Sequence, residues 1–147
     1  MNAVFKSVFA IAVLATLGLQ MAAELPTGDE PICEKPDEMP RFPGDKDAVY
    51  KFLGENLKYP YDDKMNGEEG LVMVQFIVEK DGSLTDVQTV DEKRTYGSQE
   101  MKDEAIRVIK LMPKWLPGKL NEKPVRVLYK MPIRYALSNG KKKKRSR

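Results

Sequence analysis

Residues 123–137 alternate between two kinds of side chain. Every odd-numbered position from 125 to 137 is apolar or aromatic, whereas three of the even-numbered positions hold basic residues. This period of two predicts a β-strand with one buried face. Pro132 lies inside the pattern, and proline is confined to edge strands, strand starts and bulges because it cannot donate a ladder hydrogen bond. The segment is therefore predicted to be an edge strand.

Two further segments have apolar residues at the spacing of a helix. The first lies within residues 44–59 and ends before Pro60, because the residue before a proline avoids the helical region. The second runs from Ser98, a favourable N-cap, to Met112.

A β-hairpin is predicted between these helices. Apolar runs at 70–79 and 84–90 flank Asp81-Gly82, a strong signal for a two-residue turn. Both faces of the first run are largely apolar, so this strand is expected to lie centrally or to offer its second face as a contact surface. The order helix, strand, strand, helix, strand predicts an α+β domain with two helices packed on one face of a three-stranded antiparallel sheet.

The chain divides into four segments. Residues 1–23 hold an apolar run that fits a signal peptide cleaved near Ala23, with an uncleaved signal anchor as the alternative. Residues 24–43 are rich in proline and are expected to form an extended, weakly ordered lead-in. The domain is expected over 44–138, and a basic disordered tail over 139–147.

Positive charge is concentrated in the tail. The chain has 25 Lys and Arg, of which Lys6 and six residues of 141–147 lie in the terminal segments, leaving 18 against 22 Asp and Glu. Such a basic run could suggest nucleic acid, but an export signal places the protein away from it, so no nucleic-acid partner is expected. The tail is interpreted as a solvated segment, or as a contact for anionic lipid or glycan.

The residue types offer little chemistry. The absence of histidine removes the commonest general base and zinc ligand, and the single cysteine, Cys33, has no activating partner nearby in the sequence. We find no glycine-rich phosphate loop and no clustered carboxylates of the metal-binding type. The sequence therefore predicts no enzyme, no cofactor and no metal site. Trp115 is interpreted as a lid on the core, with a binding anchor as the alternative.

Five motifs follow one another in a fixed order along the chain. They are "MPRFPGD" at 39–45, "YP" at 59–60, "GLVMVQFIVEKDGSLTDVQTV" at 70–90, "MKDEAIRVIKLMPKW" at 101–115 and "PGKLNEKPVRVLYKMPIRYAL" at 117–137. This ordered series resembles the C-terminal domain of TonB proteins over residues 39–137. The resemblance implies an α+β fold, and it implies binding, from the periplasmic side, of a short segment of outer-membrane receptors called the TonB box. In that family the segment pairs as an added strand with the domain's last strand.

Carried over to this chain, the resemblance places docking on residues 125–136. If Pro132 faces the free edge, the other even-numbered residues do too, and residues 126–130 are expected to supply open backbone with Pro132 ending the ladder. The predicted docking residues are Arg126, Val127, Leu128, Tyr129, Lys130, Pro132 and Arg134.

The chain departs from a full TonB protein near its start. A full TonB carries a spanning anchor with a serine and a histidine and then a long proline-rich spacer, whereas here Ser7 has no histidine to accompany it. Only about twenty residues separate the leader from the domain, which is at most roughly 70 Å of extended chain. The protein therefore resembles a free-standing TonB-type domain, and its part in energy transduction stays open.

Two functions are compatible with this sequence. The first is a periplasmic domain that docks an extended receptor peptide by strand addition in TonB-dependent transport. The second is a cell-envelope structural or adaptor protein that self-associates, as a homodimer for example, or binds glycan or lipid. The expected location is the periplasm, with an inner-membrane anchor facing the periplasm as the alternative; membrane association would use an uncleaved leader or the basic tail.

Overall fold

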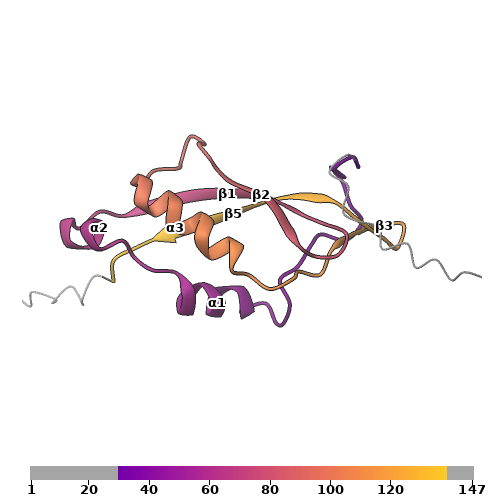
Figure 1. Ribbon diagram of the computed structural model, residues 1–147, viewed down its shortest axis with the longest axis horizontal. Helices are drawn as coiled ribbons and strands as arrows, with labels where there is room; N and C mark the ends of the chain where they lie inside the picture. Colours follow the sequence, from indigo (N-terminus) through magenta and orange to yellow (C-terminus); the bar gives the residue numbers. More distant parts are fainter. Residues whose placement is uncertain (1–29, 139–147) are drawn as a thin grey trace, which may run out of the picture.

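Residues 30–138 are described by the computed structural model shown in Figure 1. The predicted leader and basic tail lie outside the described residues. None of the described helices is both long and apolar enough to cross a membrane. In chain order the elements are α1 (Ala48–Asn56), α2 (Tyr61–Asn66), β1 (Gly70–Val78), β2 (Leu84–Val90), α3 (Gln99–Lys110), β3 (Gly118–Leu120), β4 (Lys123–Val125) and β5 (Val127–Tyr135).

The main sheet has the strand order β2-β1-β5, and both pairs are antiparallel. β1 is central, as its two apolar faces predicted, and β5 is an edge strand, as Pro132 predicted. The β1–β5 register is continuous from the pair Gly70 and Tyr135 to the pair Val78 and Val127. The alternation of buried and exposed side chains along β5 is therefore kept over its whole length.

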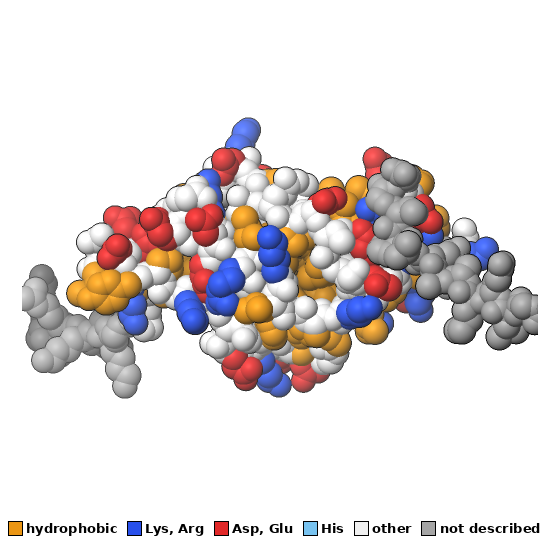
Figure 2. Space-filling model, viewed as in Figure 1, with side chains coloured by type: hydrophobic (Ala, Val, Ile, Leu, Met, Phe, Trp, Pro, Cys, Tyr) orange, Lys and Arg blue, Asp and Glu red, His pale blue; other side chains and the backbone are white. Residues whose placement is uncertain are grey.

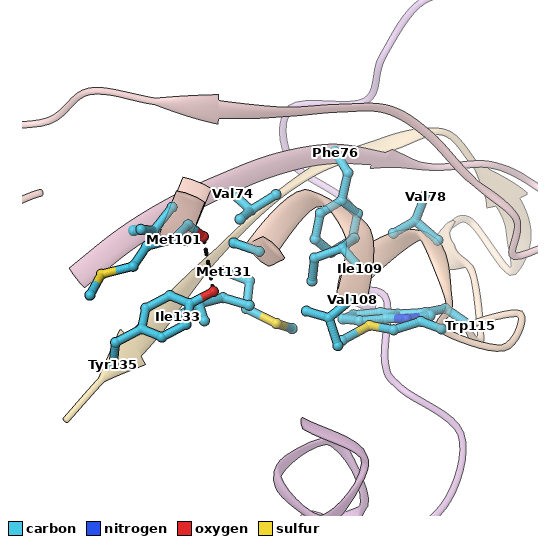
Figure 3. Close-up of a cluster of buried hydrophobic side chains, with 13 residues drawn as sticks. Val74, Phe76, Val78, Met101, Val108, Ile109, Trp115, Met131, Ile133 and Tyr135 are labelled. Carbon is cyan, nitrogen blue, oxygen red and sulfur yellow. Dashed lines mark hydrogen bonds between the residues drawn. The ribbon is translucent and has the colours of Figure 1, made fainter. Parts of the chain in front are cut away.

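The core lies between one face of the sheet and the helices. α3 begins at Ser98, whose hydroxyl oxygen accepts the Met101 N–H at 3.1 Å, and it buries an apolar stripe against β1. Figure 3 shows Phe76 of β1 above Ile109 of α3, with Trp115 at one end of the cluster and Tyr135 at the other. Each large apolar side chain buried here contributes about 1.5–3 kcal/mol relative to exposure.

α1 covers the same face of the sheet but lies at the margin of the core. It has no fully buried residue, and Val49, Phe52 and Leu53 pack half-buried against the cluster. The predicted α+β fold with two helices on one face of the sheet is thus confirmed. Trp115 is 4% exposed and contacts the rings of Phe42, Phe76 and Tyr129. It is therefore part of the core, which agrees with its interpretation as a lid on the core.

The β1–β2 connection differs from the predicted two-residue turn. The loop spans residues 79–83, in which the Gly82 N–H donates to the Glu79 carbonyl and the Glu79 N–H donates to the Ser83 carbonyl, both at 2.9 Å. The loop is fixed from outside, because the Trp115 N–H donates to the Gly82 carbonyl at 2.8 Å. A contact 33 residues along the chain therefore determines the turn, and local sequence cannot show it.

Candidate docking edge

The outer edge of β5 can be assigned from one backbone hydrogen bond. The Cys33 N–H donates to the Arg126 carbonyl at 2.8 Å, and Cys33 forms a parallel bridge with Val127. The Arg126 carbonyl therefore points away from β1. Backbone groups of alternate residues point to opposite edges of a strand, so the even-numbered residues of β5 direct their N–H and C=O groups to the free edge.

Pro132 belongs to this even-numbered set. Its missing N–H would point away from β1, so the proline deletes no hydrogen bond of the β1–β5 ladder. The N–H groups of Lys130 and Arg134 belong to the same outward set, and in the part of the chain that the structure describes neither makes a backbone hydrogen bond outside the β1–β5 ladder. The free edge thus offers one backbone donor on each side of Pro132, those of Lys130 and Arg134, while Pro132 itself offers only its carbonyl as an acceptor.

The opposite edge of the sheet, on β2, is less suited to adding a strand. The β1–β2 register shifts between Gln75 and Ile77, and Asp86 has a φ of 50°. Such a bulge bends the strand and interrupts its row of backbone groups. Of the two edges, β5 is the longer and more regular.

The lead-in occupies the start of the β5 edge. After the bridge at Cys33 it runs along the β3 segment, where the Asp37 and Glu38 N–H groups donate to the Lys119 carbonyl and Arg41 pairs with Leu116. The described part of this proline-rich segment therefore finds its backbone partners far along the chain, which compensates for its lack of a periodic pattern. The parallel bridge with Val127 pairs Cys33 with the backbone of both Arg126 and Leu128, so within 30–138 the open part of the edge begins after Leu128.

Arg126 is accordingly not part of an open ladder, which differs from the expectation for residues 126–130. Its guanidinium forms a buried ion pair with Glu79, with Nε to Oε2 at 2.7 Å and Nη2 to Oε1 at 3.0 Å, and its Nη1 donates to the Glu30 carbonyl. Lys80 also pairs with Glu30. These contacts hold the lead-in against the sheet.

Glu79 was not singled out by sequence reasoning, because its partner is 47 residues away. Burial raises the pKa of the Glu79 carboxyl, but hydrogen bonds from Arg126 and from Thr85 outweigh this effect and bring the pKa below its ordinary value. The ion pair is therefore present at neutral pH. The sequence signal for this ion pair is weak: Glu79 directly follows β1 and places a charge where the alternating pattern of the strand continues.

The remaining predicted docking residues divide between the two sheet faces. Val127 is buried and Tyr129 is half-buried, its ring 5.1 Å from that of Trp115. On the opposite face the side chains of four residues are exposed, and Lys130 forms an ion pair with Glu92 at 2.8 Å. These four are Leu128, Lys130, Pro132 and Arg134.

The family model described as Gram-negative bacterial TonB protein C-terminal matches residues 55–137. The chain belongs to this family. TonB C-terminal domains are protein-interaction domains without enzymatic activity, associated with TonB-dependent transport in the bacterial envelope. Within residues 30–138, no three His, Cys, Asp or Glu side chains are grouped so that they could hold a metal ion.

Among the solved structures similar to this chain are two NMR solution structures of the Helicobacter pylori TonB C-terminal domain. The longer is 26% identical, with a TM-score of 0.46, and the match covers 65% of this chain and 86% of that one. The shorter is 28% identical, with a TM-score of 0.47, and the match covers 62% and 91%. No curated protein matches the chain.

Proposed function

We propose that this TonB C-terminal domain docks an extended peptide of an outer-membrane receptor as an added strand on β5, in the periplasm. The observation that carries the proposal is the outward-facing row of backbone groups from Lys130 to Arg134, with Pro132 on the same edge. Strand addition uses such a row for affinity and side-chain pockets for specificity.

The backbone contribution alone is modest. Four or five hydrogen bonds at about 0.5–1.5 kcal/mol each supply about 2–7 kcal/mol, which is comparable with the cost of bringing two molecules together. Side chains of the peptide must therefore add to the affinity. A domain that has to release its partner gains from this near balance.

Pairing between two copies of the domain is the competing use of the same edge. An antiparallel β5–β5 pair would place the exposed cations Lys130 and Arg134 of both copies on one sheet face, and like charges close together across strands are destabilising. This charge arrangement favours a receptor peptide over a second copy.

The test compares Lys130→Pro with Lys130→Ala. Both variants lose the Lys130 side chain and its ion pair with Glu92, but only the proline removes the outward N–H. We expect Lys130→Pro to bind receptors from solubilised outer membranes at least tenfold more weakly than Lys130→Ala, with unchanged thermal unfolding, because no bond to β1 is lost. Receptors retained equally by the two variants would contradict strand addition at β5.

Amide hydrogen exchange supplies a second readout on the unmodified protein. A docked strand should slow exchange at Lys130 and Arg134, whose N–H groups are open. Exchange at Tyr129 and Met131 should change much less, because these amides face β1. Slowing without this alternation would point to binding elsewhere on the domain.

A further inference from the structure

A pocket lies on the core side of the free edge. Its volume is about 350 Å³, at the lower end of the range for sites that hold small molecules. The walls come from β5, the start of α1, the end of the lead-in and the segment after α3, and none comes from β1 or β2, which puts the pocket on the side of β5 away from β1. The main lining residues are Phe42, Val49, Trp115, Leu116, Tyr129 and Met131.

The walls are apolar and largely aromatic. The rings of Phe42 and Tyr129 stand edge to face with the indole of Trp115, at centroid distances of 5.9 and 5.1 Å. Figure 2 shows hydrophobic side chains reaching the surface around α1 and the loop before it. Met131 can adjust its shape, because methionine is unbranched and flexible. Such walls accept an apolar side chain, and an aromatic ring can add an edge-to-face contact.

The positions of Tyr129 and Met131 on β5 determine which side chains of a docked strand would reach the pocket. Tyr129 and Met131 hold odd-numbered positions, whose backbone groups bond β1. For a peptide that runs antiparallel to β5 they are therefore non-hydrogen-bonded sites, where side chains opposite each other come closest, with Cα atoms about 4.5 Å apart. A peptide residue opposite Tyr129 or Met131 therefore sends its side chain to the core face, where the pocket lies.

The rim of the pocket is cationic. Arg41, Lys46 and Asp45 line it. Asp45 pairs with Lys51 at 3.6 Å, whereas no carboxylate of residues 30–138 lies within 4.0 Å of the side-chain nitrogens of Arg41 or Lys46, so the rim keeps a positive excess. Charge complementarity therefore favours a peptide that carries a carboxylate beside its apolar residue.

We infer that the pocket receives one large apolar side chain, aromatic by preference, from the peptide docked on β5, and that a carboxylate of the same peptide lies at Arg41 and Lys46. This inference rests on the proposed strand addition and adds what the partner must contain. Backbone pairing accepts almost any sequence, so the pocket is what makes docking selective.

The test begins with a phage-displayed library of random heptapeptides, selected on the purified protein. Enriched peptides should share one large apolar position, with an acidic residue near it. A synthetic peptide of the enriched sequence is then compared with its alanine version at that position. We expect the parent protein to bind the alanine peptide at least about tenfold more weakly, and we expect only the first peptide to shift the emission of Trp115, the single tryptophan of the chain.

Val49→Phe is the decisive variant, because it fills the pocket from α1 without touching β5. It should reduce the ratio between the two peptide affinities to about one. Glu55→Phe places the same ring on the exposed face of α1, away from the pocket, and is the matched control; it should keep the ratio of the parent. Thermal unfolding verifies that both variants fold.

The outcomes separate this inference from the function on which it rests. If Lys130→Pro abolishes binding of the selected peptide but the two peptides bind equally, strand addition stands and the pocket is not a side-chain site. If binding survives Lys130→Pro, the proposed function is wrong and the inference falls with it. A library without any enriched sequence also counts against both.

Discussion

At the scale of single residues, the ion pair of Arg126 and Glu79 is the main departure from what the sequence predicts. The alternation of β5 places Arg126 on the solvated face, yet its side chain is only 8% exposed and that of Glu79 only 6%. The alternating pattern identifies the sheet face on which Arg126 lies, but it cannot show that the lead-in covers this residue. The two buried charges compensate each other, and hydrogen bonds from Thr85 to Glu79 and from Arg126 to the Glu30 carbonyl add to the pair.

We expect Arg126→Met to lower the free energy of unfolding by about 3–5 kcal/mol, because it leaves the Glu79 carboxylate buried without its partner. The double variant Glu79→Leu with Arg126→Met should be much less destabilised than this single one. Urea unfolding followed by Trp115 fluorescence measures both. A double variant as unstable as the single one would mean that packing, not charge, explains the loss.

The same pair predicts a pH dependence of stability. The pKa of Glu79 is below its ordinary value of 4.5 in the folded protein, so the carboxylate stabilises the fold fully above pH 4.5 and loses this effect as the pH falls through the lower, folded pKa. Urea unfolding at pH 6 and pH 3 should show a smaller drop for Glu79→Gln than for the parent. Glu55→Gln, on the exposed face of α1, is the control and should keep the drop of the parent.

At the scale of elements, sequence reasoning recovered those that have a periodic pattern and at least seven residues. It missed α2, whose six residues include adjacent Asp62 and Asp63 and no apolar stripe; tertiary contacts support it, since the Asp63 carboxylate accepts the Ser98 hydroxyl at 2.5 Å. It also missed the β3–β4 hairpin. Its turn residues Asn121 and Glu122 both have positive φ, a geometry usually signalled by Asn-Gly.

Two glycines are expected to respond in opposite ways to substitution by alanine. Gly82 has a φ of 84°, and a Cβ there would lie 2.0 Å from the Trp115 carbonyl oxygen, so Gly82→Ala should destabilise the domain by roughly 2 kcal/mol or more. Gly54 lies inside α1 with nothing near its Cβ position, and Gly54→Ala should stabilise by about 0.5–1 kcal/mol. Thermal unfolding of the two variants should shift in opposite directions; shifts of the same sign would contradict the assigned geometry.

At the scale of the whole molecule, the sheet is left open on one side and partly closed by its own chain. The fold class and the edge position of β5 followed from hydrophobic periodicity and one proline. The path of the lead-in, the pocket and the ion pair did not, because each depends on contacts between segments far apart in sequence. The sequence therefore predicted which strand forms the candidate site, but it did not predict the segments and side chains that surround this strand.

Pro132 limits how far this open edge can pair. Pro132→Thr restores an outward N–H between those of Lys130 and Arg134 without altering the ladder to β1. We expect this variant to self-associate at lower protein concentration than the parent, as measured by sedimentation velocity over a concentration series. Pro132→Ala, which also restores the N–H but has lower strand propensity, should lie between the two. Identical sedimentation of all three proteins would show that the proline does not control association.

The alternation of backbone groups along β5 also determines which mutations this stretch can tolerate. Proline at positions 128, 130 and 134 would cost only edge groups, whereas proline at 129, 131 or 133 would remove a donor to the central strand. A saturation-mutagenesis screen for folded protein should therefore tolerate proline at every second position of β5. A screen for peptide binding should reject proline at these tolerated positions as well. The spacing of permitted prolines would then report, from genetics alone, which side of the strand faces outward.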